Sequence, residues 1–217
     1  MKNGPLFLLG LFLSVLIAWS GIVLGSHAQL GKLTPFYDEG DSLAYPQRPT
    51  GLAARGQLVY TDLGCAACHT QQVRRPNAGS DQARGWGERQ SVARDYIFQT
   101  RPQIGASRFG PDLTNLAGRK PQAPGAEALF NLLYTGSATH PPYGFLFERK
   151  PIVGEPSVQA LRLSGAAAPA AGQEVVPTER ARTLVAFLLN LHTGYDYPES
   201  RPLPKEVKPE PKAEAKK

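Results

Sequence analysis

Two cysteines and a histidine at fixed spacing are the residues of this chain best suited to chemistry. They form the run Cys65-Ala66-Ala67-Cys68-His69, and the sequence contains no other cysteine. C-x-x-C-H is the attachment signature of a c-type haem, because each thiol can add across a vinyl group and the adjacent imidazole can bind iron. A zinc site would need four ligands, and a thioredoxin-like site would not need the histidine. The run predicts one covalent haem c on Cys65 and Cys68, with His69 as the proximal ligand.

The second axial ligand must be something other than methionine. A mono-haem carrier usually supplies a methionine from a loop between the haem motif and the last helix, but the only methionine here is Met1. Three histidines remain, of which His27 ends an apolar segment and His192 ends a predicted helix. His140 lies in the proline-rich loop of the expected position. We therefore predict His140 as the distal ligand, with an open sixth site as the alternative.

The N-terminal segment is apolar and long enough to cross a membrane. Its centre, residues 5–24, is 20 residues without a charged side chain. At about 1.5 Å per residue such a helix spans a hydrocarbon layer of about 30 Å. A cleaved signal peptide is the rival, because Ser26-His27-Ala28 resembles a cleavage site, but its apolar region would be only about 7–15 residues. We expect an uncleaved anchor over residues 1–30.

The charges that flank this segment predict its orientation. Lys2 precedes it, whereas Asp38, Glu39 and Asp41 follow it. The positive-inside rule then places the N-terminus in the cytoplasm and the rest on the periplasmic face of a bacterial inner membrane, where haem c is attached. The net charge of +6 is diffuse, and no basic helix with interleaved aromatics indicates a nucleic-acid partner.

Helical periodicity predicts a mostly α domain with long loops. A first helix is expected over 51–63, capped by Thr50 and ended by Gly64. Its packing face comprises Leu52, Gly56, Val59, Tyr60 and Leu63. The small residue in this face would permit close approach of another helix.

Later elements are expected as follows. Short helices are predicted over 91–100 and 126–134, and a surface excursion over 161–176. The last helix is predicted over 179–192, capped by Thr178. Its apolar face comprises Ala181, Leu184, Val185, Leu188 and Leu191.

These elements imply four parts of the chain. Residues 1–30 form the anchor, 31–49 an irregular proline-containing linker, and 50–197 the haem domain. Residues 198–217 lack aromatics and are predicted to be a disordered tail.

Two further residues are candidates for supporting the haem. Pro111, in a Gly-Pro-Asp turn, could direct its carbonyl toward the free ring N–H of His69 and so raise the basicity of that ligand. Most of the arginines between residues 74 and 108 are expected to be solvated, but a haem propionate needs a charged donor. Arg108 is the candidate, because it lies close to Pro111.

Five separated blocks of the sequence resemble one family. They are CAACHTQQVR, GWGERQSVARDYIF, IGASRFGPDLTNLAGR, PPYGFLFERKPIVG and VPTERARTLVAFLLNL. Over roughly residues 45–191 the chain resembles the membrane-anchored mono-haem cytochrome c subunit II of cbb3-type cytochrome c oxidases. The resemblance implies a class I cytochrome c domain outside the membrane. It also implies that the domain relays electrons from a donor cytochrome or other redox protein to the haem–copper catalytic subunit, without catalysis of its own.

The chain departs from this family at His140. Members of the family read Met-Pro-Pro or Met-Pro-Ser where this chain has His140-Pro141-Pro142, so the resemblance places His140 at the methionine position. Imidazole in place of a thioether favours ferric iron and lowers the potential. The rival functions are a subunit of a nitric-oxide-reductase-like complex, a gas-binding haem sensor, and a thiol or metal-binding module.

Overall fold

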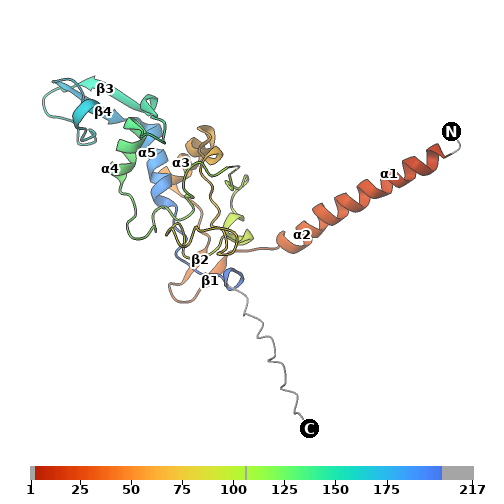
Figure 1. The fold of residues 1–217 in the computed structure, drawn as a ribbon. Helices are drawn as coiled ribbons and strands as arrows, with labels where there is room; N and C mark the ends of the chain where they lie inside the picture. The colour runs from red at the N-terminus through yellow and green to blue at the C-terminus, as the bar shows by residue number, and fades with distance from the viewer. Residues whose placement is uncertain (1–2, 106, 202–217) are drawn as a thin grey trace, which may run out of the picture.

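A computed structural model describes residues 3–105 and 107–201 of the chain (Figure 1). It begins with α1 (Gly4–Trp19), which runs through a π-helical turn (Ser20–Leu24) into α2 (Gly25–Leu30). Within the described residues, this continuous helix of 27 residues is the one that is long and apolar enough to cross a membrane. The predicted N-terminal span is thus confirmed as a helix, and it leads away from the domain in Figure 1.

The segment between the span and the domain is more regular than predicted. Strands β1 (Phe36–Asp38) and β2 (Leu43–Tyr45) form an antiparallel pair. The intervening turn is closed by side chains, since Asp38 accepts a hydrogen bond from the backbone N–H of Gly40 at 2.8 Å. The prediction of an irregular stretch over 31–49 was therefore wrong.

This hairpin is packed on the domain through aromatic side chains. Tyr45 stacks on Tyr195 with a centroid distance of 4.1 Å, and Phe36 meets Tyr197 edge-on at 6.0 Å. The guanidinium of Arg94 donates to the backbone carbonyl that precedes β1. The aromatic partners of the hairpin, Tyr195 and Tyr197, lie about 150 residues later in the chain, so local sequence patterns gave no sign of these contacts.

Two crossing helices form the centre of the domain. They are α3 (Gly51–Asp62) and α5 (Glu179–Asn190), and the second ends two residues earlier than predicted. A Cβ on Gly56 would lie 1.8 Å from the backbone oxygen of Thr183 in α5. The predicted close approach of a second helix at Gly56 is therefore confirmed.

The buried face of α3 differs from the prediction at its first turn. Its buried residues are Ala53, Gly56 and Tyr60, whereas Leu52 is 49% exposed. The buried residues are spaced by three and then four positions, so the apolar stripe begins at Ala53 rather than Leu52. Thr50 is the N-cap residue, as predicted, but its side chain makes no capping hydrogen bond.

The cap of α5 matches the prediction. Thr178 Oγ1 accepts a hydrogen bond from the backbone N–H of Ala181 at 3.4 Å. Four residues of the predicted apolar face are buried, and Leu191 is packed against the core. The structure adds Thr183 and Phe187 to the buried face.

In the sequence, α4 (Ala126–Thr135) and a second strand pair come between α3 and α5. Strand β3 (Phe147–Pro151) pairs antiparallel with β4 (Gln173–Pro177). Val175 in β4 is fully buried, so the predicted surface excursion over 161–176 was wrong at its C-terminal end. The Ala/Gly/Pro-rich loop before β4 made the whole segment look irregular in the sequence. The strand itself is short, contains two valines, and pairs with a strand that ends at Pro151.

Two other predicted segments also need correction. The helix expected over 91–100 is only a 3₁₀ turn, Ala93–Tyr96. The tail expected to be disordered from residue 198 instead begins with another 3₁₀ turn, Pro198–Ser200, in which Ser200 is buried. Residues 202–217 lie outside the described part of the chain.

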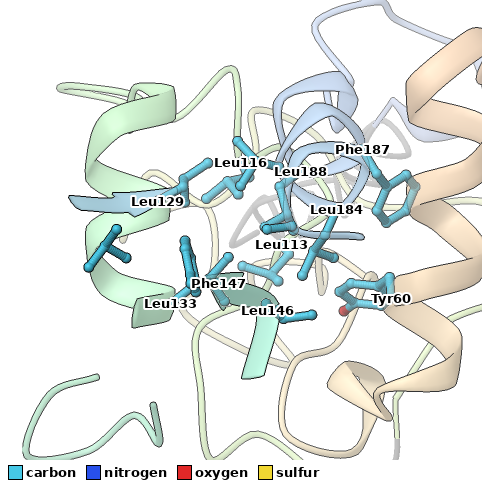
Figure 2. Packing of buried hydrophobic residues seen from close by; sticks show 13 residues of the cluster. Tyr60, Leu113, Leu116, Leu129, Leu133, Leu146, Phe147, Leu184, Phe187 and Leu188 are labelled. Carbon is cyan, nitrogen blue, oxygen red and sulfur yellow. The ribbon is translucent and has the colours of Figure 1, made fainter. Parts of the chain in front are cut away.

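The hydrophobic core lies where α3, α4, α5 and the loop after Pro111 converge (Figure 2). Figure 2 shows leucines from α4 and α5 directed toward the same region as leucines of that loop. The labelled core residues are Tyr60, Leu113, Leu116, Leu129, Leu133, Leu146, Phe147, Leu184, Phe187 and Leu188.

Candidate haem-binding site

The C-x-x-C-H run forms one turn directly after α3. Gly64 ends that helix with φ +69°, a conformation that favours glycine, and a 3₁₀ turn covers Cys65–Ala67. The backbone N–H of His69 donates to the carbonyl of Cys65 at 2.9 Å. This turn brings Cys65, Cys68 and His69 to the wall of one cavity.

That cavity has a volume of about 430 Å³, within the range of small-molecule and cofactor sites. Many of its lining residues are leucines from the end of α3, from the loop after Pro111, from α4 and from α5, and several of them also belong to the core of Figure 2. These leucines are Leu63, Leu113, Leu116, Leu129, Leu132, Leu133, Leu184 and Leu188. An apolar cavity beside two free thiols suits a flat macrocycle.

His69 is oriented by the loop opposite it. Its Nδ1 lies 2.8 Å from the carbonyl oxygen of Pro111, to which it donates in the neutral ring, so Nε2 is left for a ligand. The predicted contact is thus present in the fold, and its effect on an iron stays a prediction. Gly110 permits this approach, because a Cβ there would lie 2.3 Å from Cε1 of the ring. Burial lowers the pKa of His69, opposed by the Pro111 hydrogen bond, and the neutral imidazole is the ligating form.

His140 faces His69 across the cavity. The ring centroids are 6.2 Å apart, with an angle of 44° between the planes. Metal–imidazole bonds of about 2 Å place the centroids of two axial rings about 6 Å apart. Nδ1 of His140 is buried and has no hydrogen-bond partner among the described residues. The spacing of the rings and their shared cavity fit an iron between them.

A tight turn after α4 positions His140. Gly136 has φ +68°, and a Cβ there would lie 2.7 Å from the carbonyl oxygen of His140. The backbone of Ser137 is hydrogen bonded to that of His140 in both directions, at 2.8 Å and 3.3 Å. Pro141 and Pro142 follow and restrict the chain further. The backbone of His140 is therefore held by a closed turn between α4 and β3.

The other two histidines lie elsewhere. His27 belongs to α2 of the membrane-spanning helix. His192 follows α5, and its ring accepts a long hydrogen bond from the N–H of Gly194. Neither residue lines the cavity, so the structure leaves His140 as the histidine that faces His69.

The structure gives Arg108 a different environment from the predicted one. Its guanidinium pairs with the carboxylate of Asp81 and donates to the backbone oxygen of Gln72. Arg108 does not line the cavity. The guanidinium of Arg108, which was predicted to pair with a haem propionate, is therefore already bound by two groups of the protein.

Arg119 is the cavity residue that the sequence analysis missed. It is the one cationic side chain among the described residues that line the cavity. One guanidinium nitrogen donates to the backbone oxygen of Asp112, while Nε is buried without a partner in the described chain. Its placement depends on the fold of the loop after Pro111. The nearest sequence signal was its position at the end of the block IGASRFGPDLTNLAGR.

Comparison with known families gives one match. The family model described as "Cytochrome C oxidase, mono-heme subunit/FixO" matches residues 14–165, more than two thirds of the chain. The matched region contains the end of the apolar helix, the C-x-x-C-H turn and His140. No curated protein matches the chain.

Proposed function

This chain belongs to the FixO family of mono-haem cytochrome c subunits of cbb3-type cytochrome c oxidases, and from that premise we propose how its haem is bound and what the haem does. Membership makes the chain a membrane-anchored electron-transfer subunit of the oxidase complex that carries one haem c.

We propose that Cys65 and Cys68 hold the haem covalently, with His69 below the iron. Both cysteines and the imidazole line one cavity, and the turn after Gly64 presents them on the same side. Thioether bonds would fix the macrocycle against the leucines of α4 and α5. The hydrogen bond from His69 to Pro111 would hold the ring in the tautomer that leaves Nε2 for iron.

We propose His140 as the distal ligand in place of methionine. The observation that carries this proposal is the pair of facing imidazoles, with centroids 6.2 Å apart. Because two imidazoles favour ferric iron more than an imidazole and a thioether do, the potential should lie below that of relatives with methionine. The rigid loop around His140 would limit movement between oxidation states, which suits electron transfer.

Arg119 is proposed as the charge partner of a propionate. Its unpartnered Nε and its place on the cavity wall support this role better than the geometry of Arg108 does. A charged donor would compensate the cost of placing a carboxylate in a largely apolar cavity.

The haem supplies a one-electron couple between ferric and ferrous iron. The protein would hold it outside the membrane, with the N-terminus of the span in the cytoplasm, as the charges that flank the span indicate. A donor cytochrome or another redox protein would lose one electron to this subunit, which would pass it toward the haem–copper catalytic subunit. If the midpoint potential of this haem is lower, its electron donor should also have a lower potential than the donors of relatives with His/Met ligation.

The experiment that tests this function combines intact mass with redox titration of the purified full-length protein. We expect one covalently added haem in the wild type, and none in the double variant Cys65→Ala/Cys68→Ala. Replacement of His140 by methionine should raise the midpoint potential. A wild type without covalent haem would refute the proposed attachment, and an equal or lower potential in His140→Met would refute the distal role.

A further inference from the structure

A fully buried carboxylate lies directly behind the proximal loop. Asp112 is 0% exposed, and one of its oxygens accepts from the hydroxyl of Thr70 at 2.5 Å and from the N–H of Gln72 at 2.8 Å. The other oxygen accepts from the N–H of Thr114 at 2.9 Å. All three contacts are donated to Asp112, which is the pattern of an ionised carboxylate.

Asp112 and a second buried carboxylate, Asp81, lie beside the same arginine. Nη2 of Arg108 lies 3.6 Å from the carboxylate of Asp112, while Nη1 pairs with Asp81. Asp81 is 2% exposed and also accepts from the N–H of Arg74 at 2.7 Å. Two buried carboxylates therefore share the guanidinium of Arg108, whereas the guanidinium of Arg119 donates to the backbone oxygen of Asp112. In the low dielectric of a protein interior the carboxylate of Asp112 acts strongly on nearby groups.

The hydrogen bonds of Asp112 join the two segments that orient His69. Thr70 and Gln72 follow His69 in the chain, and Pro111, whose carbonyl accepts from His69, immediately precedes Asp112. The N–H of the next residue, Leu113, also donates to the carbonyl of Thr70 at 2.8 Å. The position of the Pro111 carbonyl thus depends on bonds made by its neighbour.

We propose that Asp112 is a positioning residue for His69 that lowers the midpoint potential of the haem, and that Arg108 couples it to Asp81. This inference rests on the proposed ligation of the haem by His69. Reduction adds one electron to the iron centre, and a fixed negative charge behind the proximal ligand opposes it. A firmly held Pro111 carbonyl also lowers the midpoint potential, because its hydrogen bond raises the basicity of the imidazole.

The test is redox titration of the full-length haem protein carrying Asp112→Asn, which removes the charge at nearly constant volume. We expect a higher midpoint potential than in the wild type, with the low-spin spectrum retained. Asp81→Asn should also raise the potential, but less, because it acts through Arg108. The control Asp196→Asn removes an exposed carboxylate that pairs with Arg201, and it should leave the potential unchanged.

The sign of the shift separates this role from a purely structural one. If Asp112 only supports packing, Asn would loosen the loop and admit water, which stabilises the more highly charged ferric haem and lowers the potential. A lower or unchanged potential in Asp112→Asn therefore overturns the proposal. If this variant does not accumulate, Asp81→Asn decides, and an unchanged or lower potential there also overturns it. Loss of covalent haem from the wild type would instead refute the proposed function.

Discussion

The contact between α3 and α5 at Gly56 should fail if this residue gains a single methyl group. An added Cβ would lie 1.8 Å from the carbonyl oxygen and 2.5 Å from the carbonyl carbon of Thr183, and 2.7 Å from Cβ of Phe187. Ordinary contacts are about 3.5 Å, so the helices must separate by more than an ångström. The obstructing atoms are mainly backbone and cannot rotate away. This places Gly56→Ala near the upper end of the overpacking range, about 3 kcal/mol.

Part of this cost is offset, because alanine is better than glycine in a helix by about 1 kcal/mol. We therefore expect Gly56→Ala to lower the free energy of unfolding by about 2 kcal/mol. The assay is denaturant unfolding of the full-length haem protein in detergent, followed by far-ultraviolet circular dichroism. The matched control is Gly144→Ala, since a Cβ there meets no atom within 4 Å. Equal stability of the two variants would refute the packing argument.

Three further predictions concern a cap, alkaline stability and a cavity charge. Thr178→Ala should lower the free energy of unfolding by about 1 kcal/mol, because it removes a capping hydrogen bond. Thr50→Ala removes no capping bond and should lower it by less than about 0.5 kcal/mol. Equal losses of stability in denaturant unfolding would contradict this prediction. Burial raises the pKa of Tyr195 from 10.0 to about 12, so the unfolded chain releases this proton first and stability should fall as the pH rises from 10 toward 12. Circular dichroism should show that fall, and Tyr195→Phe should reduce its slope; an unchanged slope would exclude this phenol as the cause. Arg119→Gln should lower the midpoint potential in a redox titration, because it removes a positive charge from the cavity. The control Arg162→Gln changes an exposed arginine and should leave the potential unchanged. Equal potentials in the two variants would exclude Arg119 as the propionate partner.

The features predicted correctly from sequence are mainly those encoded over a few neighbouring residues. The glycine within the apolar face of α3 predicted the close helix crossing, and Gly64 predicted the end of that helix. The cap at Thr178 followed from the residue type directly before an apolar periodic segment. The hydrogen bond between His69 and Pro111 was predicted from the Gly-Pro-Asp turn that follows a C-x-x-C-H run, and the structure places the two groups together.

The features that were missed depend on contacts between distant segments. The hairpin packs on the domain through Tyr45 and Tyr195, and β4, which begins at Gln173, pairs with β3, which ends at Pro151. Arg108 and Arg119 look alike in the sequence. Only the fold shows that Asp81 pairs with Arg108 while Arg119 reaches the cavity.

The most direct test of the central claim is low-temperature electron paramagnetic resonance of the oxidised full-length protein, compared with His140→Ala. Ligation by His69 and His140 predicts a low-spin bis-imidazole signal in the wild type and a high-spin or altered signal in the variant. An unchanged signal in His140→Ala would exclude His140 as a ligand. A high-spin wild type would contradict the six-coordinate relay and favour an open iron site that binds a gas.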